Sequence, residues 1–180
     1  MISFKANLTT QTSVKRLRNE KAYVDMPAYL VELDLSSKSN LKTLQKVSKS
    51  WENGDLYAVD VCSRFQINQE NPENNYGERF FVLTRQNSSW DNLDYRKILG
   101  VAELYEPSDD CTEIEFLQTN PKYLQKVKPK MKNIGKSIVE AFIEMVKGKE
   151  FSLFTTPTAK MFYEKLGFVN IESNLMRLKR

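Results

Sequence analysis

The sequence MKNIGKSIV (residues 131–139) lies between two strand-like segments and begins the helix that joins them. EIEFLQT (113–119) precedes it and FSLFT (151–155) follows it. Apolar residues at helical spacing predict a helix from about Ile134 to Lys147. A strand, a crossover helix and a second strand form a βαβ unit with parallel strands. Ligands of such units lie at the carboxyl ends of the strands, which is where this helix begins.

The other segments predict a mixed α/β fold. A helix with Asn40 as its N-cap is expected to run to about Trp51, and another is expected to begin with Thr156 as N-cap and Pro157 in the first position. Further strands are expected at 29–35, 55–67, 79–86, 97–106 and 111–119, with a final hairpin around Ser173-Asn174. This order implies a mixed sheet with helices packed on it. Residues 1–27 give no clear element.

Length and composition narrow the class of protein. A chain of 180 residues with 41% hydrophobic residues suits one domain, 1–180, with its own core. No apolar run is long enough for a bilayer span, and the N-terminal sequence lacks the apolar stretch of a signal peptide. Cys62 and Cys111 are therefore expected to be reduced, in a soluble cytoplasmic protein. The absence of histidine excludes a Ser-His-Asp triad and an HExxH zinc site, and we expect no metal.

The positive charge is concentrated around the opening segment. The net charge is +4, yet no acidic residue occurs between Glu115 and Glu140. That interval contains six lysines: Lys122, Lys126, Lys128, Lys130, Lys132 and Lys136. A local positive field attracts phosphate. A solvated, lysine-rich loop explains the same charges.

The letters GKS resemble the end of an ATP-binding P-loop, but the spacing excludes one. A P-loop needs a glycine five positions before Gly135, and Lys130 occupies that position. A helix N-terminus nevertheless binds an anion through its unpaired amides and its dipole. Gly135 allows close approach of the ligand to the backbone. An ordinary helix start with an incidental glycine is the alternative.

Three motifs in order resemble the GNAT superfamily of acyl-CoA-dependent N-acyltransferases, over about residues 97–172. KNIGKS (132–137) resembles the Q/R-x-x-G-x-G/A loop, and TPTAKMFYEKLGF (156–168) resembles the N-x-x-A-x-x-x-Y-E-K-x-G-F helix. EIEFLQTNP (113–121) resembles the strand before the loop. The sequence departs from the pattern at Lys132, Ser137 and Thr156, which replace Gln or Arg, Gly or Ala, and Asn.

The resemblance implies a mostly antiparallel sheet flanked by helices and splayed open at an acyl-CoA site. Acetyl-CoA would be the acyl-donor substrate, and longer acyl donors stay open. Pantetheine would pair with the strand backbone, and the pyrophosphate would lie on the loop amides. The implied binding residues are Leu117, Gln118, Thr119, Lys132, Asn133, Ile134, Gly135, Lys136, Ser137, Ile138 and Thr156.

The same resemblance implies an amine acceptor and direct acetyl transfer. Tyr163 occupies the position of the family's tyrosine acid, and a phenol with a pKa of about 10 stays protonated. Core packing is an equally good reason for that tyrosine. Glu113 is the favoured base over Glu115, because in some family members the first acid of a similar EI pattern is the base, acting directly or through water. Solvated strand carboxylates, with a water chain taking the proton, remain the alternative.

Two other functions compete with an acetyltransferase. A non-catalytic module of the same fold would bind CoA or a partner without turnover. A nucleic-acid binder would use the lysines, but these lack interleaved aromatics apart from Tyr123, which argues against nucleic acid. The sequence predicts no membrane contact. It leaves open the acceptor, a small molecule or a protein, and whether the protein forms a homo-oligomer.

Overall fold

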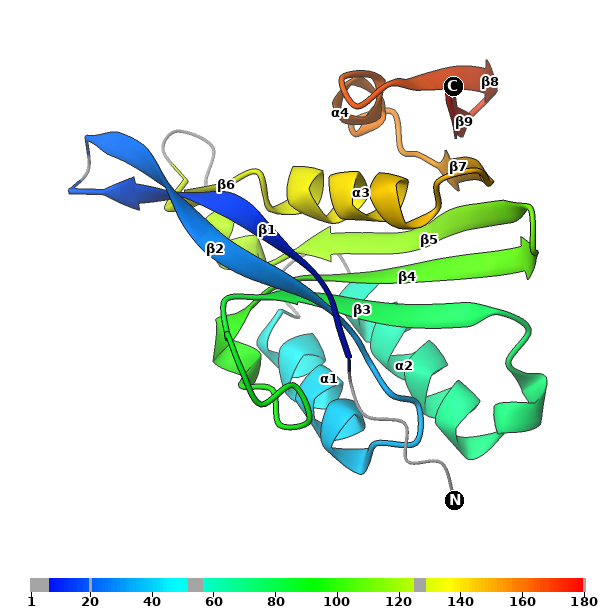
Figure 1. Ribbon diagram of the computed structural model, residues 1–180, viewed down its shortest axis with the longest axis horizontal. Coiled ribbons are helices and arrows are strands. Elements are labelled where there is room, and N and C mark those ends of the chain that lie inside the picture. Colours follow the sequence, from blue (N-terminus) through cyan, green and yellow to red (C-terminus); the bar gives the residue numbers. More distant parts are fainter. Residues whose placement is uncertain (1–6, 20, 52–56, 125–128, 180) are drawn as a thin grey trace.

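The computed structural model describes residues 7–19, 21–51, 57–124 and 129–179. In these residues a sheet of nine strands runs in the order β6-β1-β2-β3-β4-β5-β7-β9-β8 (Figure 1). The strands are β1 Asn7–Arg18, β2 Ala22–Glu32, β3 Glu78–Thr84, β4 Ile98–Ser108, β5 Cys111–Thr119, β6 Met131–Lys132, β7 Glu150–Phe154, β8 Phe168–Glu172 and β9 Leu175–Leu178. The helices are α1 Lys38–Ser50, α2 Tyr57–Glu70, α3 Ile134–Met145 and α4 Lys160–Glu164.

Helices cover both faces of the sheet, and this explains the apolar run of β3. Phe80 and Val82 face α1 and α2, where they belong to a cluster with Phe65. Phe81 and Leu83 point to the other face and belong to the cluster of α3. These four residues of β3 are each at most 1% exposed. A strand that is buried on both faces reads as a continuous apolar run rather than an alternation.

The predicted mixed and mostly antiparallel sheet is confirmed. The pair β5–β7 is parallel, as the βαβ unit requires, and every other described strand pair is antiparallel. The α3 helix crosses between these two strands, and the final hairpin β8–β9 turns at Ser173-Asn174. None of the described helices is long and apolar enough to cross a membrane.

The strand predicted at 55–67 is wrong. Residues 55 and 56 lie outside the described residues, and Tyr57–Glu70 forms α2. The buried residues of α2 are Ala58, Val61, Cys62, Phe65 and Asn68. Their spacing of three and four residues is helical, and the neighbouring β-branched residues obscured it in the sequence. This correction brings Tyr57 to the first turn of a helix.

Two predicted helix caps are also wrong. Ser37, not Asn40, caps α1, because its side chain accepts the amide of Asn40 and leaves Asn40 buried inside the helix. Thr156 does not cap α4, which begins at Lys160 after a turn. The amide of Ala159 donates to the Thr156 carbonyl at 3.0 Å, and the Thr156 hydroxyl pairs with the Thr158 hydroxyl. A turn therefore precedes the helix.

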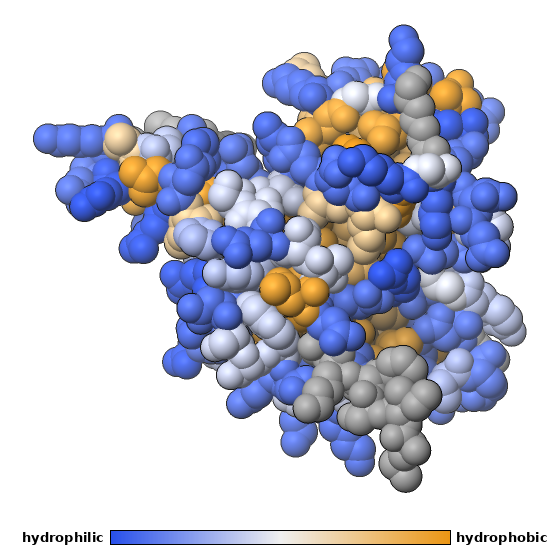
Figure 2. All heavy atoms as spheres, in the orientation of Figure 1, coloured by the Kyte–Doolittle hydropathy of each residue, from blue (hydrophilic) through white to orange (hydrophobic). Residues whose placement is uncertain are grey.

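The N-terminal residues that gave no clear prediction form a long hairpin. β2 pairs with β3 only through Tyr29–Glu32, and the strand predicted at 29–35 ends at Glu32. All of β2 pairs with β1, and among the described residues this is the only strand partner of Ala22–Ala28. In Figure 1 this part of the hairpin projects beyond the sheet, and in Figure 2 its surface is mainly hydrophilic. We call residues 13–28 of the hairpin, as far as they are described, the arm.

The sheet opens between β5 and β7. Their pairing is limited to Cys111–Ile114 with Glu150–Leu153. The register of β4 with β5 shifts at this point, because Leu104 pairs with Ile114 whereas Glu103 pairs with Phe116. Glu115 is thus the extra residue of a β-bulge, which bends the strand and ends its pairing with β7. The predicted splay is confirmed.

Candidate active site

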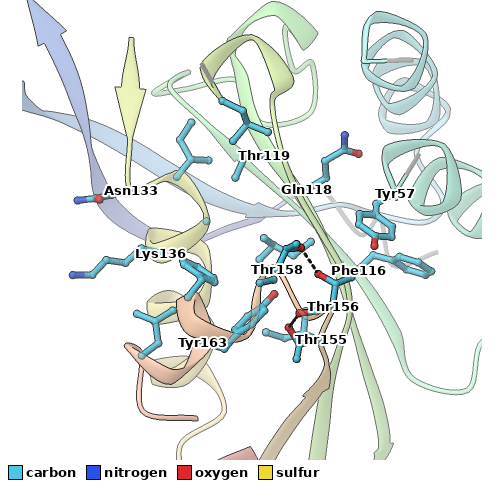
Figure 3. Close-up of a pocket in the computed structure, with 18 of the residues that line it drawn as sticks. Tyr57, Phe116, Gln118, Thr119, Asn133, Lys136, Thr155, Thr156, Thr158 and Tyr163 are labelled. Carbon is cyan, nitrogen blue, oxygen red and sulfur yellow. Dashed lines mark hydrogen bonds between the residues drawn. The ribbon is translucent and has the colours of Figure 1, made fainter. Parts of the chain in front are cut away.

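A cavity of about 1120 Å³ occupies the gap between β5 and β7. Its walls come from β5, the first turn of α3, the segment after β7 and the helix α4 (Figure 3). A gap between two diverging strands leaves the backbone groups of both edges without sheet partners. The part of β5 from Glu115 to Thr119 faces the cavity and is not paired with β7. An extended ligand can therefore add to this edge through main-chain hydrogen bonds.

The first turn of α3 closes one end of the cavity. Asn133 precedes the helix in the left-handed conformation (φ 65°, ψ 15°), and its side chain does not cap the helix. Asparagine tolerates this conformation better than most residues. A left-handed residue followed by right-handed ones directs consecutive amides into one concavity, which binds anions. Asn133, Ile134, Gly135 and Lys136 all line the cavity.

Two residues predicted to bind the pyrophosphate do not line this concavity. The amide of Ser137 donates to the Asn133 carbonyl at 2.9 Å, so it is used inside the helix. The Ser137 hydroxyl lies 2.6 Å from the Ser13 carbonyl of β1. Ile138 is fully buried in the core. The free amides of a helix are those of its first turn, which ends before these residues.

Gly135 keeps the concavity open. A Cβ atom at this position would lie 3.4 Å from Phe162, 3.5 Å from Thr119 and 3.6 Å from Leu117. These contacts join α3 to α4 and β5 across the cavity. A methyl group fits there, whereas a longer side chain would enter the space. The glycine therefore matters for the approach of a ligand rather than for backbone conformation.

The five remaining predicted binding residues are all at the cavity. Leu117, Gln118, Thr119, Lys132 and Thr156 all line the cavity. The Gln118 side chain is used elsewhere, because its Oε1 accepts the Ala58 amide at 2.6 Å at the start of α2. Its Nε2 has no hydrogen-bond partner among the described residues.

Tyr163 projects from α4 into the buried end of the cavity. Its ring packs edge-on against Phe162 and Phe168, at centroid distances of 4.9 and 5.8 Å, and 8% of the residue is exposed. Burial raises the pKa of the phenol to about 12, with a smaller contribution from Tyr57. The hydroxyl therefore stays protonated at neutral pH and can donate a hydrogen bond into the cavity.

Tyr57 is a cavity residue that the sequence did not identify. It begins α2, lines the cavity and packs against Phe116 at a centroid distance of 5.9 Å. Figure 3 shows Tyr57 and Tyr163 directed inward from opposite walls. The predicted strand at 55–67 hid this placement. The contact between α2 and β5 that creates it is a tertiary one, with no signal in the local sequence.

The two candidate bases are placed differently. Glu115, the bulge residue, lines the cavity, whereas Glu113 is not among the lining residues. Burial raises the pKa of the Glu113 carboxyl, the negative charge of Glu115 raises it further, and a hydrogen bond with Ser152 opposes the shift. Among the described residues, no three His, Cys, Asp or Glu side chains gather as a metal site would need.

A third carboxyl lies behind the bulge. Glu103 is 0% exposed, its Oε1 accepts Arg64 Nε at 2.6 Å, and its Oε2 has no partner among the described residues. Burial raises the pKa of Glu103 to about 7, which outweighs the attraction of Arg64; the charges of Glu115 and Glu78 add to it.

This buried carboxyl should make stability depend on pH. An unfolded glutamate titrates near pH 4.3, so between about pH 4 and 7 the folded protein keeps a proton that the unfolded chain loses. Raising the pH through this window lowers the free energy of unfolding. The Glu103→Gln variant lacks the titrating group. Between pH 5 and 8, the free energy of unfolding of wild type should therefore fall by about 1–3 kcal/mol more than that of the variant, as measured by urea unfolding. Glu144→Gln, at an exposed carboxyl, is the control. A pH-independent difference for Glu103→Gln would contradict the expectation.

The fold resembles solved structures of acetyltransferases. A GNAT-family acetyltransferase from Staphylococcus aureus Mu50 gives a TM-score of 0.53 at 17% identity, covering 84% of this chain and 99% of that chain. A protein from Desulfovibrio desulfuricans, described as a GNAT-family acetyltransferase, gives 0.57 at 13% identity, with 84% and 98% covered. Tetrahymena GCN5 gives 0.50 at 13% identity, with 78% and 88% covered. No protein-family model and no curated protein sequence matches the chain.

These likenesses define the class of structure. The protein has the GNAT fold: a mixed, mostly antiparallel sheet that opens beside a helix N-terminus. Likeness at identities of 13–17% shows the fold of the chain.

Proposed function

We propose that this protein transfers an acetyl group from acetyl-CoA directly to a primary amine of a small molecule or a protein. One observation carries the proposal: a single cavity joins an anion-binding concavity at α3 to a buried phenol, Tyr163, along an unpaired strand edge. Each part matches one part of the donor. The concavity suits the pyrophosphate, the β5 edge suits pantetheine amides, and the buried end suits the thioester.

In the proposed reaction, the amine nitrogen attacks the thioester carbonyl carbon. The C–N bond forms, the C–S bond breaks, and the amine gives up one proton while the sulfur gains one. Backbone amides of β5 beside the Glu115 bulge, where the strand is not paired with β7, would stabilise the developing oxyanion. The Tyr163 hydroxyl donates a hydrogen bond to the leaving sulfur. A phenol with a pKa of about 12 is a weaker acid than a thiol near 8.5, so it stabilises the thiolate while the final proton comes from water.

The proposal is tested by binding and then by turnover. Acetyl-CoA at about 1 mM should raise the melting temperature, because a ligand of the folded state stabilises it. A panel of amines, from diamines to peptides with a free N-terminus or a lysine, should then release CoA thiol. Binding without release from any amine would favour a non-catalytic CoA-binding module. Neither a thermal shift nor release would contradict the proposal.

The base is assigned by comparing two variants. We place the role on Glu115, because it lines the cavity and Glu113 does not. Glu115→Gln should lower kcat/KM by about 100-fold at neutral pH, since general-base catalysis contributes this much or more, whereas Glu113→Gln should lower it less than about tenfold. The measurement is initial rates with the best amine of the panel. The reverse order of effects would assign the base to Glu113, acting through water.

The cytoplasm is the compartment we propose. Cys62 and Cys111 are both free in the structure, and unpaired thiols fit a reducing compartment.

A further inference from the structure

We propose that the arm and the segment beneath it, residues 129–132, form a subsite for the 3′-phosphate of the CoA nucleotide. This inference rests on the proposed function, because it concerns the same donor. It assigns a role to the N-terminal hairpin, which lies beside β6 at one edge of the sheet, whereas Tyr163 belongs to α4 near the other edge (Figure 1).

Hydrogen bonds from the arm hold residues 129–132 in place. The Leu17 amide donates to the Lys130 carbonyl at 2.9 Å, and the Tyr23 hydroxyl donates to the Pro129 carbonyl at 2.7 Å. The short strand β6 pairs with β1, so that Lys132 lies opposite Lys15. These bonds come from side chains and backbone more than 100 residues away in sequence. The position of this segment is therefore set by its contacts with the arm.

The same segment is a wall of the cavity. Pro129, Met131 and Lys132 line it, together with Tyr123 and Leu124. The cavity thus extends past the first turn of α3 toward the arm. A ligand whose pyrophosphate lies on that turn, and whose pantetheine follows β5, has its nucleotide at this arm-side end. Apolar side chains suit the adenine base, and a cation suits the phosphate.

Lys132 is the cation that the arm positions. Its Nζ lies 4.1 Å from the centroid of the Tyr23 ring, which holds the ammonium without neutralising it. The opposite residue, Lys15, is neutralised by Asp25 at 2.9 Å. Within the part of the chain that the structure describes, no carboxylate forms an ion pair with Lys132, whereas Lys136 pairs with Glu140 at 3.5 Å. An unpaired lysine held on an aromatic ring at a cavity wall is suited to an incoming phosphate.

The test compares CoA with dephospho-CoA, which differs only in the 3′-phosphate. Calorimetric titrations of the full chain are made at a fixed ionic strength of about 0.1 M, because screening weakens such contacts. Wild type should bind CoA about tenfold more tightly, which corresponds to about 1.4 kcal/mol. Lys132→Ala should bring the ratio close to one by weakening CoA alone, and Lys132→Arg should keep most of it.

Two further variants separate position from charge. Tyr23→Ala should reduce the preference for CoA over dephospho-CoA, because it removes the ring that lies against Lys132. Tyr23→Phe keeps the ring and loses only the hydrogen bond to Pro129, so it should reduce this preference less. Lys147→Ala removes one exposed lysine just beyond the C-terminal end of α3 and should leave the ratio unchanged.

Each failure is distinguishable. If neither ligand binds wild type, the proposed function fails. If both bind equally, or if Lys132→Ala weakens both equally, acetyl-CoA remains the donor and the 3′-phosphate subsite is overturned.

Discussion

The Tyr163→Phe variant is expected to lower kcat by about 100-fold while the dissociation constant of acetyl-CoA changes little. The substitution removes only the phenolic hydroxyl. In the proposed reaction this hydroxyl donates a hydrogen bond to the sulfur as the C–S bond breaks. Loss of one such donor to a developing charge costs about 10²–10³ in kcat. The ring contacts with Phe162 and Phe168 are kept, so the fold should be unchanged.

The measurement is steady-state kinetics with the best amine, with acetyl-CoA binding followed by calorimetry. Burial holds the pKa of Tyr163 at about 12, so wild-type kcat should show no loss from this group between pH 6 and 10. The control is Tyr76→Phe, which removes a hydroxyl from a tyrosine that is 71% exposed and outside the cavity. An unchanged kcat in Tyr163→Phe would mean that this tyrosine only packs.

Gly135→Glu is expected to weaken acetyl-CoA binding by at least about 100-fold. Its side chain would enter the space between Phe162, Thr119 and Leu117. Its carboxylate would meet the same amides that are proposed to hold the pyrophosphate, and would repel it. A glutamate in the first turn is favourable for the helix itself, so the protein should stay folded.

Two further variants at position 135 separate the effects of side-chain volume and charge. Gly135→Ala adds only a methyl group in ordinary contact with its neighbours, and should change the dissociation constant less than about fivefold. Gly135→Gln fills the same volume without the charge, so its difference from Gly135→Glu isolates the electrostatic part. Wild-type affinity in Gly135→Glu would show that the pyrophosphate is not held at this turn.

The local sequence predicted the elements whose pattern is self-contained. Strands β3, β4 and β5 and the helix α3 lie close to where their apolar periodicity placed them. It also predicted the helix start at Ile134 and the parallel pairing of β5 with β7. It failed at α2, because a short apolar stretch rich in valine suits both a strand and a buried helix. Packing on β4 and β5 decides between them there.

In the candidate site, too, some residues could be predicted from the local sequence and others depend on tertiary contacts. Gly135, Lys136 and Tyr163 could be named from motif position, because their roles follow from a local helix. Glu115 could not be chosen over Glu113, because the β-bulge arises from the register of β5 against β4. Tyr57 could not be found at all, since α2 brings it to the cavity.

By itself, then, MKNIGKSIV determined a helix start with unpaired amides and a dense positive charge, because hydrogen-bonding and charge are properties of the local chain. Only the tertiary structure decided what surrounds it. Ser137 is turned toward β1, and Tyr23 and Lys132 are brought together by the arm. Contacts between segments more than 100 residues apart depend on which surfaces pack together. No window of local sequence contains that information.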